Sequence, residues 1–227
     1  MLAALIRAIA DLSAPPLRRV VWLSLGLAVL SFTVLWLAIA VVLDAGVHLA
    51  WRPLDWLVQL VGAAGVLGLS WMLFPAVSTL ILGFFLDRIA AEIEALDYPG
   101  SAAPRRPPIR EVIGLTLRLM IVSIVVNVVA LPVYVLAPGV NFFVFLCLNG
   151  YLFGRQYFEV VALRRLDMAA IRAVRHRFGW RIFAAGVVIT GLFAVPFVNL
   201  LAPVIATAFM VHVYARLARL DPQAFTV

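Results

Sequence analysis

A pair of arginines is the first group in this chain whose side chains could bind a ligand. Arg18 and Arg19 stand together, close to a pair of prolines. Their guanidinium groups could hold a tetrahedral oxyanion such as sulfate or phosphate, because the planar fork of donors matches the oxygens of that anion. A basic pair is also a common marker of the cytoplasmic end of a membrane span. The residues alone leave both interpretations open.

Two asparagines occupy matching places in the chain. Asn141 and Asn199 each end the pattern Pro-x-Val-Asn, and each pattern interrupts an apolar stretch without charged residues. Backbone amides freed at such a break, together with the asparagine side chains, could line a polar path, because a helix N-terminus attracts anions. Each asparagine could also cap the helix that follows it. We expect capping as the immediate role, and it is compatible with the first.

An arginine and a glutamate lie four residues apart where one apolar stretch ends. Arg155 and Glu159 would meet on one helical face. Either charge alone would be expensive beside lipid, so we predict a structural ion pair rather than a proton relay. Arg118 and Arg164 are alternative partners of Glu159.

Enzyme signatures are missing from the sequence. Phosphate loops, nucleophile elbows and zinc-protease motifs do not occur. His48, His176 and His212 are scattered without ligand spacing, so we interpret them as interfacial or structural rather than as metal ligands. We expect no catalytic residue, no metal, no cofactor and no nucleic-acid partner.

The composition indicates that the solvent of this chain is lipid. Of its 227 residues, 65% are hydrophobic and 13% are charged, and the mean hydropathy is +1.10. A soluble domain carries about twice that share of charge. All 18 basic residues are arginine, and all except Arg52 fall on one side of the expected topology. The positive-inside rule then predicts that both termini are cytoplasmic.

The lengths of the uncharged stretches predict the architecture. Residues 20–43 extend for about 36 Å as a helix, enough to cross a hydrocarbon core of about 30 Å. The four arms around the two asparagine patterns reach only about 21 to 27 Å. We therefore expect an all-α integral membrane protein with two full transmembrane helices, two hemi-penetrating helical hairpins and amphipathic interfacial helices. Its expected parts, in a single membrane domain over 1–227, are an interfacial helix (1–19), a transmembrane helix (20–43), a second one with a cytoplasmic extension (54–97), a linker (99–108), a first hairpin (109–166), a basic amphipathic helix (167–181) and a second hairpin (182–219).

Several segments carry a resemblance to a known family. They are Ser13-Ala-Pro-Pro-Leu-Arg-Arg19, Phe74-Pro75, Phe84-Phe-Leu-Asp-Arg88, Leu148-Asn-Gly-Tyr-Leu-Phe-Gly-Arg-Gln-Tyr-Phe-Glu159, Ala162-Leu-Arg-Arg165 and Val195-Pro-Phe-Val-Asn-Leu-Leu-Ala-Pro203. In these segments, over nearly its whole length, the chain resembles the CysZ/etoposide-induced membrane protein family. The resemblance implies an oligomer in the bacterial inner membrane that takes up sulfate for cysteine synthesis. It also implies a sulfate site made by Arg18, Arg19 and the second hairpin turn, including Asn199 and Leu200.

Two functions from different classes follow. The first is an uncoupled or channel-like sulfate permease, with Arg18, Arg19, Asn141, Asn199 and Leu200 as its substrate-binding residues. The alternative is a non-transporting member of the same family that shapes the membrane or scaffolds partners, with interfacial helices inserted into the cytoplasmic monolayer. Flux of labelled sulfate distinguishes the two.

Overall fold

The computed structural model describes residues 1–15, 17–19, 85–99, 104–105, 107–195 and 198–225, together with single positions between 22 and 65. These residues are helical apart from short connections and contain no strand, so the all-α fold class is confirmed. The transmembrane helix expected over 20–43 and the membrane part of the one expected over 54–97 lie outside the described residues, apart from those single positions.

Both expected hairpins are formed by pairs of helices. In chain order, the helical elements are α1 (Leu2–Asp11), α4 (Leu86–Asp97), α5 (Ile109–Leu136), the 3-10 turn η1 (Pro138–Val140), α6 (Asn141–Leu163), α7 (Met168–Arg177), α8 (Gly179–Ala194), α9 (Val198–Leu220) and the 3-10 turn η2 (Pro222–Phe225). The hairpin expected over 109–166 thus consists of α5, η1 and α6, and the one expected over 182–219 consists of α8 and α9.

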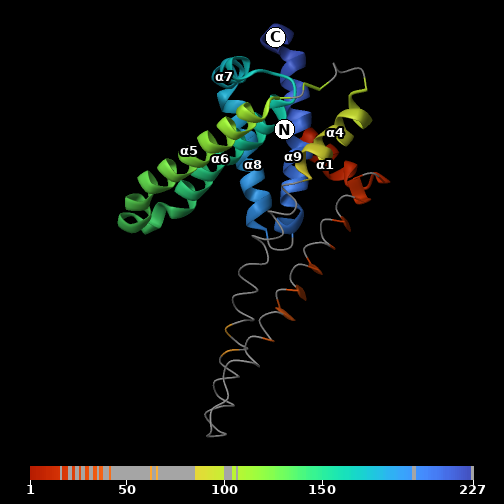
Figure 1. Cartoon of the computed structure of the whole chain (residues 1–227). Helices are drawn as coiled ribbons and strands as arrows, with labels where there is room; N and C mark the ends of the chain where they lie inside the picture. The colour runs from red at the N-terminus through yellow and green to blue at the C-terminus, as the bar shows by residue number, and fades with distance from the viewer. Residues whose placement is uncertain are drawn as a thin grey trace, which may run out of the picture.

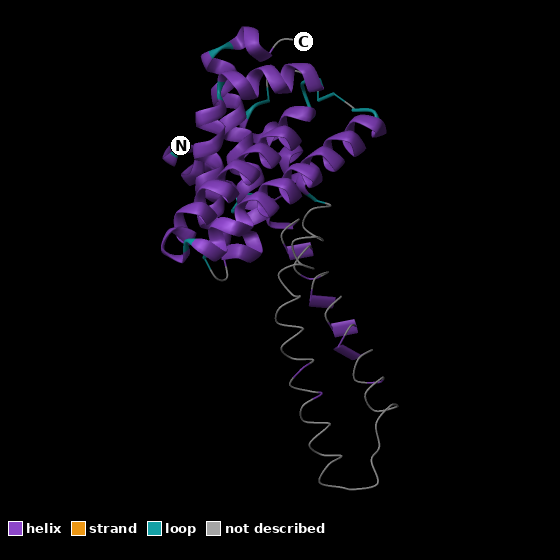
Figure 2. Cartoon of the chain, turned by 90° about the vertical axis from the view of Figure 1, so that its left-hand side faces the viewer, coloured by secondary structure: helices purple, strands orange, loops and turns teal. Residues whose placement is uncertain are grey.

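Helix α9 is the element around which the bundle packs. It contacts α1, α4, α6 and α8, which gather about it in Figure 1. Its residues from Ala202 to Tyr214 are buried. Phe209 of α9 and Phe158 of α6 are among the largest side chains that are fully buried. Figure 2 shows, in a view turned by 90°, that these helices form one body. The apolar length of α9 therefore supplies the protein core.

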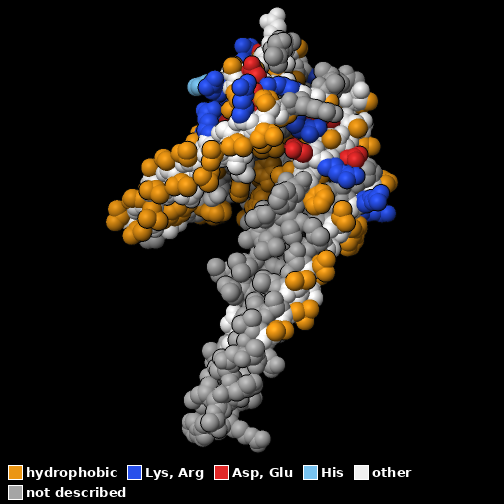
Figure 3. All heavy atoms as spheres, viewed as in Figure 1, with side chains coloured by type: hydrophobic (Ala, Val, Ile, Leu, Met, Phe, Trp, Pro, Cys, Tyr) orange, Lys and Arg blue, Asp and Glu red, His pale blue; other side chains and the backbone are white. Residues whose placement is uncertain are grey.

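The α5–α6 hairpin projects from this body (Figure 1). Helix α5 has 28 residues, about 42 Å, because it begins at Ile109, before the uncharged run. The helix is therefore longer than the uncharged run of 119–136, and by length and composition α5 is sufficient to cross a membrane. Within α5 only Leu115 and Ala130 are buried. Hydrophobic side chains cover the hairpin in Figure 3, while charged ones gather on the bundle. An exposed apolar surface of this size indicates contact with lipid or with another protein chain.

Helix α1 divides its apolar residues between two sides. Leu2, Ile6 and Ile9 are exposed, whereas Ala8 is buried and Leu5 packs against the core. The inner side therefore docks on the bundle. The outer side offers hydrophobic side chains to the surroundings, as an interfacial helix would.

Helices α6 and α8 approach each other backbone to backbone. Gly150 and Gly154 of α6 face Gly186 of α8. A Cβ atom added at Gly186 would lie 2.7 Å from the Cα of Gly154, and closer still to the carbonyl oxygen of Gly150. Glycine four residues apart on one helix lets a neighbouring helix pack in direct contact. At its other end, α8 meets α7 at a bend of 89°.

Candidate functional site

The paired arginines lie on the surface of the described structure. Arg18 and Arg19 are both exposed, whereas Leu17 just before them is fully buried. The backbone N–H of Arg18 donates to the carbonyl of Ala14 at 2.9 Å, so the pair sits on a helical turn. Among the described residues, no carboxylate lies within ion-pair distance of either guanidinium.

Asn141 does not cap the helix that follows it, which corrects the capping role expected from the sequence. The N-cap of α6 is Val140, and it makes no side-chain capping bond. The 3-10 turn before α6 shifts the helix start by one residue, so Asn141 is already its first residue. Its side-chain Nδ2 donates instead to the carbonyl of Tyr134 at 3.2 Å. It thereby satisfies a carbonyl in the last turn of α5.

Asn199 also lies inside its helix, since α9 begins at Val198. Its backbone N–H donates to the carbonyl of Val195 at 3.0 Å, and the residue is half-buried. Leu200 is helical, but its side chain lies outside the described residues, as does Phe197. The turn of the α5–α6 hairpin and the turn between α8 and α9 lie apart in Figure 1. The structure therefore does not bring Asn141 and Asn199 together.

A buried ion triad joins α6 to α7. Arg155 Nε donates to Glu159 Oε1 at 2.9 Å, and Arg175 Nη1 pairs with the same oxygen. The side chains of Arg155 and Glu159 are 6% and 1% exposed. Two guanidinium groups against one carboxylate leave this cluster with an excess positive charge. Arg164, the alternative partner of Glu159, pairs instead with Glu94 at 3.3 Å.

A cleft of about 240 Å³ opens beside this triad, at the bend between α7 and α8. We call it the α7–α8 cleft. Its lining residues are Tyr151, Arg155, Arg175, His176, Gly179, Ile182 and Phe183. Arg155 Nη1 donates to the Tyr151 hydroxyl at 3.3 Å, which leaves the hydroxyl proton of Tyr151 available. Arg155 Nη2 is buried and has no hydrogen-bond partner. The cleft thus combines positive charge with a donor that the described residues do not satisfy.

Local sequence explains how Arg175 reaches the triad. Asp167 caps α7 by accepting from the backbone N–H of Ala170 at 2.7 Å. Ile171 and Val174 are buried on one side of the helix. Arg175 follows at the edge of that buried side, and so its guanidinium can turn inward while the side chains further round α7 remain exposed.

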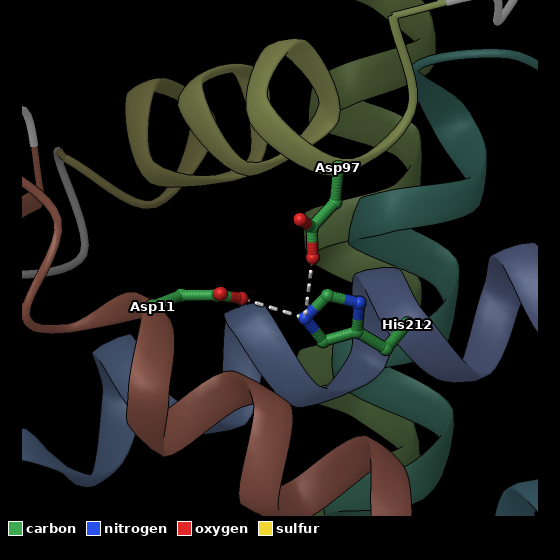
Figure 4. A group of neighbouring side chains, drawn as sticks. All are labelled: Asp11, Asp97 and His212. Atoms are coloured by element: carbon green, nitrogen blue, oxygen red, sulfur yellow. Dashed lines mark hydrogen bonds and ion pairs between the residues drawn. The ribbon is translucent and has the colours of Figure 1, made fainter.

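A second polar cluster fastens α1 to the bundle (Figure 4). His212 Nε2 lies 2.7 Å from Asp11 Oδ2 and 3.7 Å from Asp97 Oδ2, and His212 Nδ1 lies 2.8 Å from the Tyr98 hydroxyl. Burial raises the pKa of Tyr98, so the hydroxyl keeps its proton and can donate to Nδ1. Nε2–H then donates to Asp11. Arg7 Nε also pairs with Asp97 at 2.9 Å.

This cluster is the group of described residues with the spacing for a metal ion. One ligand atom from each of Asp11, Asp97 and His212 lies within 4.8 Å of the others. Both nitrogens of His212 are already engaged, and Asp97 is held by Arg7. The bonds present favour the structural interpretation, in which His212 ties α1 and the end of α4 to α9.

Sequence reasoning missed two parts of this arrangement. Arg175 lies sixteen residues from Glu159, beyond any helical spacing that would link them. The contact of Gly150 and Gly154 with Gly186 was missed as well, although Gly-x-x-x-Gly within α6 is a readable signal for close helix packing.

Comparison with known proteins gives one family. A model described as sulfate transporter CysZ/etoposide-induced protein 2.4 matches residues 4–203. The matched range contains both predicted arginines, both hairpin turns and the ion triad. A search of curated proteins finds no match to the chain. The description is that of a transporter family rather than an enzyme family.

Proposed function

Because this chain belongs to the sulfate transporter CysZ/etoposide-induced protein 2.4 family, we propose that it is a sulfate permease. The observation that carries the proposal is the family match over residues 4–203. In this proposal the chain resides in the bacterial inner membrane with both termini cytoplasmic. It lets sulfate enter down its gradient, without a coupled ion or ATP, for cysteine synthesis.

The exposed apolar surface supports a membrane transporter. Helices α5 and α9 contain segments long and apolar enough to cross a membrane. In α5 that segment is only 6% buried, so nearly all of it is left for lipid or for another copy of the chain. A homo-oligomer would cover part of this surface, and it is the assembly we propose. The transport path would then run through or between its subunits.

The exposed arginines support sulfate as the ion. Arg18 and Arg19 could each offer two N–H donors to a tetrahedral dianion, because no described carboxylate competes for them. Asn141 and the second turn with Asn199 and Leu200 would provide further polar contacts. The start of α9 adds the partial positive charge of a helix N-terminus. Together these groups would replace water around sulfate as it enters the path.

Uptake of labelled sulfate into proteoliposomes tests the proposal. The wild-type chain should carry sulfate well above empty liposomes. The variant Arg18→Ala/Arg19→Ala should fall by about tenfold or more, because each lost charge-assisted bond is worth about 1.5 to 3 kcal/mol. Arg88→Ala, an exposed arginine on α4, is the matched control and should transport normally. Wild-type flux equal to that of empty liposomes, or normal flux in the double variant, would reject the permease.

One observation favours the second candidate, a membrane-shaping protein of the same family. The outer side of α1 exposes Leu2, Ile6 and Ile9, which could insert into one monolayer. In that case the chain should bind small vesicles more strongly than large ones. The substitution Ile6→Ser should weaken this binding, and no sulfate flux should be seen.

A further inference from the structure

The α7–α8 cleft has features that the proposed transport function does not use. It is lined by Arg155 and Arg175, yet its residues are distinct from Arg18, Arg19 and the two hairpin turns. Its volume of about 240 Å³ far exceeds the roughly 30 Å³ that one water occupies in the liquid. A tetrahedral oxyanion therefore fits with some of its hydration shell.

The donors of the cleft are only partly satisfied. Arg155 is 5% exposed, and its Nε and Nη1 are bonded to Glu159 and Tyr151. Its Nη2 has no partner, although it is buried. An unsatisfied buried donor of a charged group is costly, so an acceptor that reached Nη2 through a small shift of the guanidinium would be favoured. Tyr151 also lines the cleft, and its hydroxyl proton is a second donor.

The electrostatic balance favours an anion. Glu159 neutralises one of the two guanidinium groups, leaving one positive charge from the triad. Gly179, the first residue of α8, also lines the cleft. Helix α8 has no side-chain cap and no acidic residue in its first turn, so its free amides add partial positive charge.

We propose that the α7–α8 cleft binds a tetrahedral oxyanion, either free sulfate or the phosphate of an anionic lipid headgroup. Arg155, Arg175 and Tyr151 are the ligand side chains. The assignment of sulfate rests on the proposed permease function, whereas the oxyanion chemistry rests on the cleft itself.

Equilibrium binding of radiolabelled sulfate to the full chain in phosphatidylcholine nanodiscs tests the site. The wild-type chain should bind saturably, with sodium chloride at matched ionic strength as the reference. Arg175→Gln should bind sulfate at least about tenfold more weakly than the wild type, because it loses a charge-assisted contact. Arg172→Gln, an exposed arginine on the same helix, should stay within about twofold of the wild type.

Removing Arg155 alone would leave the buried Glu159 with Arg175 as its one remaining partner in the triad, and the loss of buried pairing would destabilise the chain. The neutral pair Arg155→Gln/Glu159→Gln keeps a hydrogen bond in place, and Tyr151→Phe keeps the ring. The neutral pair leaves the net charge of the triad unchanged but removes the guanidinium donors of Arg155, and Tyr151→Phe removes the hydroxyl donor. Both should therefore weaken sulfate binding while the unfolding temperature, measured in parallel, stays close to that of the wild type. Sulfate binding equal to the wild type in Arg175→Gln and in the neutral pair would overturn the site.

Nanodiscs that contain phosphatidylglycerol separate the two sources of the oxyanion. If the headgroup is the ligand, this lipid should displace sulfate, and native mass spectrometry should show a lipid retained by the wild type but lost from Arg175→Gln. Binding of neither ligand would overturn the proposal.

The same variants distinguish failure of the cleft from failure of the permease. If the wild type transports sulfate and the cleft variants bind sulfate as tightly as the wild type does, the cleft site is rejected and the permease function is retained. If sulfate binds at the cleft but the wild type shows no sulfate flux, the permease function is rejected and the cleft site is retained.

Discussion

Replacing Gly186 by alanine tests how closely α6 and α8 pack. The added methyl group would lie 2.7 Å from the Cα of Gly154 and would also meet the backbone of Gly150. Backbone atoms cannot rotate away as a flexible side chain can, so the two helices must separate. Overpacking of this kind costs about 1 to 3 kcal/mol. A gap of about 0.5 to 1 Å also forfeits about a quarter to a half of each dispersion contact along the interface.

The helix propensity of alanine partly offsets this cost. Alanine in place of glycine gains up to about 1 kcal/mol in a helix interior. We therefore expect Gly186→Ala to lower the free energy of unfolding by about 2 kcal/mol. For a chain of this size that corresponds to a fall in unfolding temperature of about 4 to 8 °C.

Thermal unfolding of the purified full chain in detergent, followed by circular dichroism, measures the effect. Gly191→Ala is the matched control, because Gly191 is exposed on the same helix and nothing lies within 4 Å of an added Cβ. It should unfold at or slightly above the wild-type temperature. If Gly186→Ala and Gly191→Ala unfold together, the backbone contact between α6 and α8 is not formed.

Two further variants probe the caps and clusters that hold the bundle together, by the same thermal assay. Asp167→Ala should cost about 1 kcal/mol by removing the N-cap of α7, and Asp167→Asn, which keeps an acceptor, should cost less. His212→Leu should cost about 2 to 3 kcal/mol, because it breaks the bonds to Tyr98 and Asp11 and leaves the carboxylate without its partner. His176→Leu, at an exposed position, is its control, and equal unfolding temperatures for the two histidine variants would show that the cluster does not hold α1.

Local patterns were enough to predict the helices that lie within the described residues. The Pro-x-Val-Asn breaks separate α5 from α6 and α8 from α9, because proline and the residue before it disfavour continued helix. Asp167 could be recognised as the cap of α7 because a carboxylate before a helical repeat accepts from its first amides. Each of these features depends on residues within one turn of each other.

The candidate site could be predicted only in part, since its parts come from different helices. The contact of Arg155 with Glu159 follows a four-residue helical spacing. Arg175 joins them only because α7 folds back over α6, which no local pattern indicates. The capping role predicted for Asn141 was wrong for a geometric reason. The 3-10 turn before α6 makes Val140 the N-cap, so Asn141 is already the first residue of the helix.

The α6–α8 contact and the α7–α8 cleft form a single structural unit. Gly154 precedes Arg155 on α6, and Ile182 of α8 both touches Gly154 and lines the cleft. Any change that pushes α8 away from α6 therefore moves one wall of the cleft relative to the guanidinium of Arg155. Gly186→Ala should weaken anion binding at the cleft as well as stability, even though Gly186 does not line it. Arg18 and Arg19 follow α1 and do not line the cleft, so replacing them should reduce sulfate flux but leave this binding intact.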